Sequence, residues 1–121
     1  MLEAAVVIDT NNQPVYWHTP LERSGGSLPD SQKLWEVIWE HRDVLKGLAH
    51  SHPGSGVPGP SWEDRTTFSA IERALGQRLD WWITSSDTVV LLQWAGPDKH
   101  NYEAVRIEDP PWVGELRRLS V

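Results

Sequence analysis

The chain contains no cysteine, which excludes disulfide bonds and any zinc site that depends on thiolate ligands. Cytidine deaminases, whose zinc is held by a Cys-x-x-Cys pair, are excluded on the same ground. Basic residues are also in the minority. The chain has 11 Lys and Arg residues and 17 Asp and Glu residues, which gives a formal net charge of −6, and no basic stripe is present. We therefore expect no nucleic acid as a partner, because nothing would neutralise its phosphates.

Long hydrophobic runs are missing as well. No apolar stretch approaches the roughly 20 residues that a membrane-spanning helix needs, so no membrane association is expected. The only early hydrophobic run is bracketed by Glu3 and Asp9, unlike the start of a secretory signal peptide. A cytoplasmic protein is the expectation, and a length of 121 residues suits a single domain spanning residues 1–121.

Hydrophobic periodicity predicts strands that alternate with helices. Strands are expected at residues 4–8, 15–18, 45–52, 81–84, 88–94 and 102–107. Helices are expected from residue 30 or 31 to about 44 and over 61–79, with an irregular tail or a short helix after 109–111. This order predicts an α/β fold, with a mixed central sheet flanked by helices.

Residues 50–64, which read HSHPGSGVPGPSWED, hold the strongest candidates for chemistry. If His50 and His52 lie on one strand, the two-residue period aims both imidazoles at the same face of the sheet. Ser61 can cap the next helix by accepting a bond from the Asp64 N–H. The Asp64 carboxylate then lies in the first helical turn, where a negative charge is favoured.

Two imidazole nitrogens and one carboxylate oxygen are three of the four ligands of a hydrolytic zinc site, and they leave one position for water. Each part alone has a simpler explanation, because His-x-His is usually incidental and Ser-x-x-Asp is a common helix start. Their joint occurrence within fifteen residues favours the metal site.

The same residues resemble the JAMM signature of zinc metallopeptidases, also called the JAB or MPN-plus family: His-Ser-His-Pro, a short loop, then Ser-x-x-Asp. The resemblance implies the JAB/MPN architecture, which is related to that of cytidine deaminases. It implies one Zn²⁺ per chain, held by His50, His52 and Asp64. It further implies that Ser61 helps to hold the oxyanion, and that a glutamate before a hydrophobic strand is the general acid/base. Glu3, followed by AAVVI, stands in that relation.

Members of this family cleave peptide or isopeptide bonds next to ubiquitin or ubiquitin-like proteins. The resemblance therefore implies deconjugation or C-terminal processing, with a ubiquitin-like or sulfur-carrier-like protein as substrate and partner. A catalytically inactive JAB/MPN-fold interaction module is one alternative, and a protein with a structural metal is another. We interpret Trp62, which precedes Asp64 by two residues, as lining the groove for the substrate tail.

The chain departs from the family pattern in the loop before the helix, where eight residues rather than seven separate the second histidine from Ser61. Counting from His52 selects Glu63 as the third ligand, whereas counting from Ser61 selects Asp64. The spacing within a helical turn is rigid and the length of a loop is not, so Asp64 is preferred.

Two further departures concern the N-terminal glutamate. Family members often carry Cys-Gly shortly after it, where Ala5 and Val6 stand here, and only two residues precede Glu3. A solvated terminal charge is the alternative interpretation of Glu3. Glu22 is the alternative general base, although no strand would hold it in place.

Eight tryptophans are many for this length, and buried aromatic surface is expected to explain most of them. Trp35 and Trp39 are four residues apart on a predicted helix and either form a docking patch or pack beneath a loop.

Overall fold

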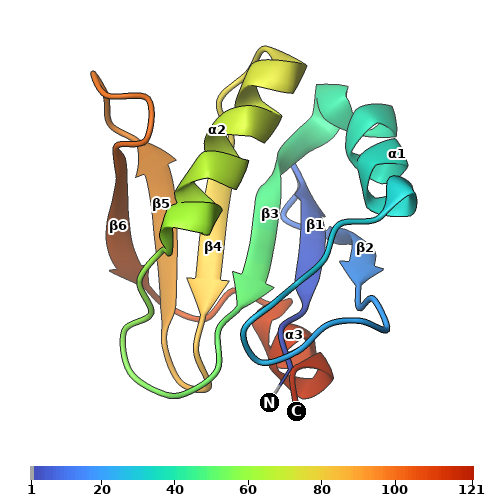
Figure 1. Cartoon of the computed structure of the whole chain (residues 1–121), viewed down its shortest axis with the longest axis vertical. Helices are drawn as coiled ribbons and strands as arrows, with labels where there is room; N and C mark the ends of the chain where they lie inside the picture. Colours follow the sequence, from blue (N-terminus) through green and yellow to red (C-terminus); the bar gives the residue numbers. More distant parts are fainter. Residues whose placement is uncertain (1) are drawn as a thin grey trace.

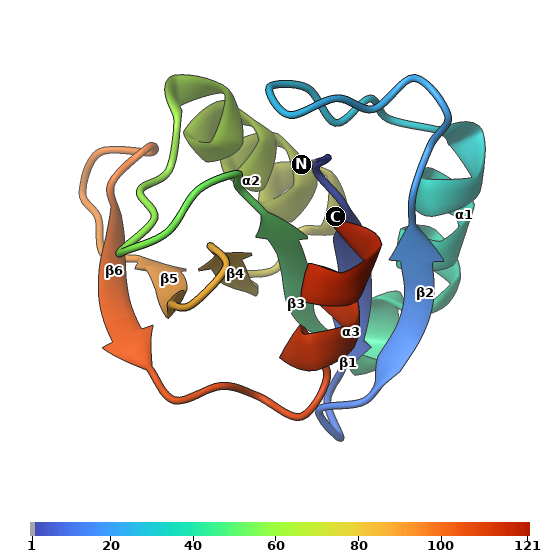
Figure 2. The ribbon, with the colours of Figure 1, turned by 90° about the horizontal axis from the view of Figure 1, so that it is seen from below.

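In a computed structural model that describes residues 2–121, the chain forms one six-stranded sheet with helices on both faces (Figures 1 and 2). The strands are β1 (Ala5–Asp9), β2 (Pro14–His18), β3 (Leu45–Ser51), β4 (Asp80–Thr84), β5 (Val89–Trp94) and β6 (Tyr102–Ile107). The helices are α1 (Gln32–Glu40), α2 (Trp62–Leu75) and α3 (Val113–Leu119), with a 3-10 turn, η1 (Arg42–Val44). The predicted α/β class with a mixed, helix-flanked sheet is confirmed.

The order of strands across the sheet is β2-β1-β3-β4-β5-β6. β3 and β4 are parallel, and every other neighbouring pair is antiparallel. A parallel pair needs a crossover, which α2 supplies as it returns the chain from the end of β3 to the start of β4. The N-terminus of α2 therefore follows the carboxyl end of β3, where the predicted histidines lie.

The helices lie on opposite faces of the sheet (Figure 2), and the sheet separates the core into two clusters of buried residues. α1 and α2 cover one face, and the buried residues there include Val7, Leu34, Ile38, Leu48, Phe68, Ile71, Trp81 and Leu92. α3 covers the other face, with Val6, Ile8, Ala49, Trp82, Trp112 and Leu116 among its buried residues. Alternate residues of β1 and β3 thus supply both clusters, as the two-residue period requires.

Helix α2 is shorter than predicted because Gly76 ends it. Gly76 has a φ of 69°, a left-handed conformation that glycine adopts readily, and its N–H bonds back to Arg73 O and Glu72 O. Leu79 is still buried, but from the segment that enters β4 rather than from the helix. The predicted helix to residue 44 likewise ends at Glu40, and its last turn is replaced by η1.

A buried carboxylate joins α2 to the sheet. Glu72 is only 3 % exposed, and its oxygens accept hydrogen bonds from Leu79 N (2.9 Å), Trp81 Nε1 (2.9 Å) and the Tyr102 hydroxyl. Arg78 Nη1 lies 2.9 Å from the same carboxylate. Because all these donors converge on one side chain, Glu72 fixes α2 against β4 and β6.

The two ends of the described chain lie side by side (Figure 1). Leu2 N donates to Ser120 O at 2.9 Å, which attaches the segment before β1 to the end of α3. No helix within residues 2–121 combines the length and the apolar character needed to cross a membrane.

The tryptophans are distributed between core and surface. Trp81, Trp82 and Trp112 are buried, and Trp17 and Trp94 pack partly against the core clusters. The remaining three are exposed: Trp35, Trp39 and Trp62. Burial therefore explains most but not all of them.

Candidate metal centre

Strand β3, which ends at Ser51 rather than at residue 52 as predicted, and the residue after it present the two histidines to the face covered by α2. His50 lies on this face, with its ring 6.2 Å from that of Phe68. Ser51 points to the opposite face, where its Oγ accepts a 2.7 Å bond from Ser120 Oγ. His52 follows the strand, and its N–H still donates to Thr84 O at 2.9 Å. The predicted alternation of the three side chains is confirmed.

The loop of residues 53–60 is anchored to the turn between β4 and β5. Gly56 N donates to Asp87 Oδ1 (2.8 Å), Ser85 Oγ donates to Gly56 O (2.6 Å), and Ser86 N donates to Gly54 O (2.9 Å). The bond from Gly56 N–H, with those from Thr88 and Ser85, lowers the pKa of Asp87. No local pattern in the sequence indicates this role of Asp87, because its partner lies 31 residues away.

A capping box orients the carboxylate of Asp64. Asp64 N donates to Ser61 Oγ at 3.0 Å, and Ser61 N donates to Asp64 Oδ2 at 2.9 Å. The same carboxylate also faces the histidines, with Asp64 Oδ1 3.1 Å from His50 Nε2 and Oδ2 3.1 Å from His52 Nε2. Asp64, rather than Glu63, therefore makes the contacts with both imidazoles.

The three groups enclose a site of suitable size for a metal ion. The Nε2 atoms of His50 and His52 are 3.1 Å apart, the same distance that separates each of them from an oxygen of Asp64. Ligands about 2.0–2.1 Å from a tetrahedral zinc ion are roughly 3.3–3.4 Å from one another. These three side chains could therefore hold a divalent cation after shifts of a few tenths of an ångström.

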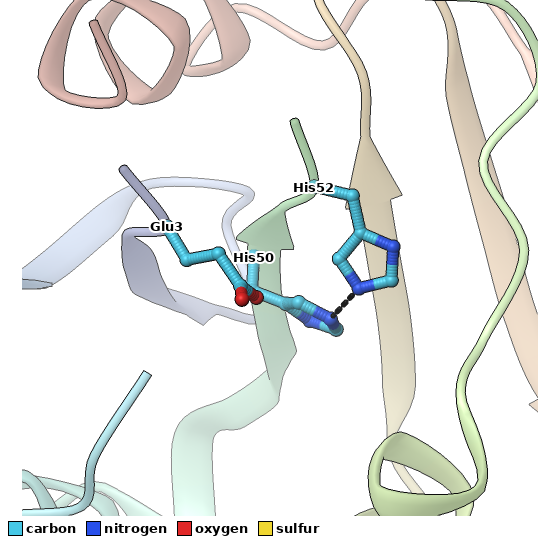
Figure 3. Close-up of side chains that lie close together, drawn as sticks. All are labelled: Glu3, His50 and His52. Atoms are coloured by element: carbon cyan, nitrogen blue, oxygen red, sulfur yellow. Dashed lines mark hydrogen bonds between the residues drawn. The ribbon is translucent and has the colours of Figure 1, made fainter. Parts of the chain in front are cut away.

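Glu3 approaches the same pair of histidines from the N-terminal side (Figure 3). Ala5 of β1 is paired with His50, and the same antiparallel register continued by two residues places Glu3 opposite His52. One carboxylate oxygen of Glu3 and one nitrogen from each histidine lie within 4.8 Å of one another. Glu3 is 9 % exposed, so it is not a solvated terminal charge. Glu22, by contrast, is exposed and does not line the cavity at this site.

Two carboxylates thus flank the imidazole pair, and either could be a ligand. Asp64 is in hydrogen-bond contact with both rings, through a different oxygen for each, whereas an oxygen of Glu3 lies within 4.8 Å of a nitrogen of each ring. The closer contacts favour Asp64 as the third ligand. Glu3 would then lie beside a cation held by the other three side chains.

The electrostatics of the site favour a positive charge between these groups. Burial raises the pKa of Asp64, but hydrogen bonds with His50 and His52 outweigh it and hold the pKa well below its usual range. The hydrogen bond with Asp64 also raises the pKa of His52 against the effect of burial. Burial is the main cause of a raised pKa at Glu3, which the charges of the two histidines partly offset.

The site opens into a cavity of about 780 Å³. Its apolar floor is formed by residues of α1, β3, α2 and β4: Leu34, Leu48, Phe68, Ile71 and Trp81. Residues 25–28 form part of its wall. His18 is buried and its Nε2 donates to Pro29 O at 2.6 Å, so it holds the segment that follows this wall. No local pattern in the sequence reveals that contact.

Ser61 and Trp62 both line the cavity. The Ser61 hydroxyl oxygen accepts the bond from Asp64 N–H, so its hydrogen can still be donated to another group. Trp62 is 65 % exposed, and its ring meets the ring of His100 edge-on at 4.7 Å. An exposed aromatic held beside this cluster of histidines and carboxylates is available for contact with a ligand.

No protein-family model matches this sequence, and no curated protein is significantly similar to it.

Proposed function

We propose that this chain is a zinc-dependent hydrolase of the JAMM type, with the JAB/MPN architecture. The observation that carries the proposal is the placement of His50, His52 and Asp64. The two Nε2 atoms are 3.1 Å apart, each lies 3.1 Å from a different oxygen of Asp64, and a second carboxylate lies beside them. The zinc ligands of a catalytic site are three protein side chains, and a fourth position stays open. A closed structural site would use four.

The donor set fits zinc. Imidazole nitrogens and a carboxylate oxygen are common zinc ligands, and the lowered pKa of Asp64 keeps that carboxylate ionised at neutral pH. Zinc bound there would acidify a water molecule and polarise the carbonyl of the substrate. The remaining steps fall to side chains of the protein.

Glu3 is the proposed general acid/base. It would take the proton of the attacking water and later deliver it to the leaving amine, as the bond between carbonyl carbon and nitrogen breaks. Burial raises its pKa, which brings a carboxylate closer to the range where it exchanges protons at neutral pH. Ser61 would donate its hydroxyl hydrogen to the carbonyl oxygen as negative charge develops there.

The proposed substrate is a peptide or isopeptide bond next to a ubiquitin-like or sulfur-carrier-like protein. The cavity, with Trp62 on its rim and residues 25–28 on its wall, offers room for an extended chain beside the histidines. Deconjugation and C-terminal processing would both use such a groove. An inactive interaction module with the same fold would bind the partner without a metal.

Metal analysis and a cleavage assay together test this proposal. We expect one zinc per purified chain and chelator-sensitive release of aminocoumarin from the C-terminus of a ubiquitin-like protein. H52A should lose both zinc and activity, because it removes a ligand. E3Q should keep zinc and lose about 10²–10⁴-fold in kcat, the usual contribution of a general acid/base. A chain that binds no zinc, or an E3Q variant with full activity, would contradict the mechanism.

A further inference from the structure

Glu3 lies before the first residue of β1 and outside its strand ladder, so other contacts hold it in line with the register of β1 and β3. Hydrogen bonds to three other segments hold its main chain and the residues beside it. Glu3 N donates to Ser24 O at 2.9 Å, Ala4 N donates to Ser51 Oγ at 2.9 Å, and Leu2 N donates to Ser120 O at 2.9 Å. The carbonyl of Glu3 is held by a side chain instead.

That side chain is Arg23. Its Nη1 donates to Glu3 O at 3.2 Å and to Leu119 O at 2.8 Å. One nitrogen thus connects the loop after β2, the segment before β1 and the end of α3. The guanidinium is only partly exposed, so water competes less for these two carbonyls than it would on an open surface.

We propose that Arg23 is a positioning residue, which keeps the Glu3 carboxylate beside His50 and His52 by holding the main-chain carbonyl of Glu3. This inference rests on the proposed function for its effect on catalysis. Its contacts are with main-chain oxygens, so Arg23 acts through Glu3 and not on the substrate. A displacement of about 1 Å at a catalytic group costs up to ~100-fold in rate.

The test compares R23M with R23K and with a matched control, R42M. Methionine keeps most of the aliphatic stem but offers no donor. Lysine restores a nitrogen with three donors, which suffices because Nη1 alone makes both contacts. Arg42, in η1, also donates from its Nη1 to a main-chain carbonyl, Trp39 O of α1 at 2.7 Å, and it does not line the cavity at the metal centre.

With the aminocoumarin substrate described above, R23M should lose about 10–100-fold in kcat, keep KM within about twofold, and retain its zinc. R23K should recover most of this loss, and R42M should match the wild type. A rise in KM without a fall in kcat would overturn the inference, and so would an R23K variant no better than R23M at equal thermal stability.

Amide hydrogen exchange separates this inference from the proposed function, because it needs no substrate. In R23M, exchange should be faster at the Glu3 and Ala4 amides, while R42M should leave it unchanged. If the wild type cleaves nothing yet R23M shows this acceleration, the proposed function fails and the positioning role stands. Unchanged exchange in R23M would overturn the positioning role whatever the activity.

Discussion

Ser61 has two separable tasks in this structure, and replacing it with alanine should affect them by different amounts. As the N-cap of α2, its Oγ accepts from Asp64 N–H at 3.0 Å. Loss of such a cap costs about 1 kcal/mol of stability. As the proposed donor to the developing oxyanion, it should contribute about 2.7–4 kcal/mol to the transition state, or roughly 10²–10³-fold in kcat.

The chain supplies a matched control for the first task. Ser31 is the N-cap of α1, and its Oγ accepts from Leu34 N–H at 3.1 Å. S31A should therefore lose about as much stability as S61A, while its kcat stays within about twofold of the wild type. S61T should recover most of both losses, because threonine provides the same hydroxyl.

The assays are urea unfolding, zinc content and kcat on the aminocoumarin substrate. S61A should retain zinc, because Ser61 N still donates to Asp64 Oδ2 and the carboxylate stays oriented. If S61A hydrolysed the substrate at the full rate, the oxyanion role would be wrong. If S31A and S61A lost activity equally, the effect would be one of helix stability and not of catalysis.

Three other outcomes follow from the same contacts. D64N should lose zinc while E63Q keeps it, because Asp64 alone touches both imidazoles; metal analysis showing the reverse would assign the ligand to Glu63. W62A should raise KM about tenfold and leave zinc content intact, since truncating an aromatic contact often costs over ~1 kcal/mol; an unchanged KM removes Trp62 from the groove. E72A should lower the free energy of unfolding by about 3 kcal/mol or more, because three buried donors lose their acceptor. The exposed E103A should change it by less than about 0.5 kcal/mol in the same urea titration, and equal losses would contradict the role of Glu72.

The local part of the site follows from the sequence. The orientation of His50 and His52 is set by the period of a strand, and the distance from Ser61 to Asp64 is set by one turn of helix. Both are regular geometries that hold for any sequence that forms the element. This is why the capping box and the alternation of the strand agree with what the spacing predicts.

The contacts between distant segments do not follow from the sequence. Glu72 would be expected on the exposed face of α2, and only its partners in β4 and β6 explain why it is buried. Arg23 is an ordinary loop residue until the fold brings it to carbonyls 20 and 96 residues away. The predicted end of α2 at residue 79 is wrong for a related reason. Leu79 continues the apolar period of the helix, but Gly76 has already ended it.

The meeting of the two chain ends has a practical consequence for the experiments above. Leu2, which immediately precedes Glu3, donates a main-chain hydrogen bond to Ser120 near the other end of the chain. A polyhistidine tag fused at either end would bring additional imidazoles within reach of that cluster. Metal stoichiometry should therefore be measured on protein from which any such tag has been removed.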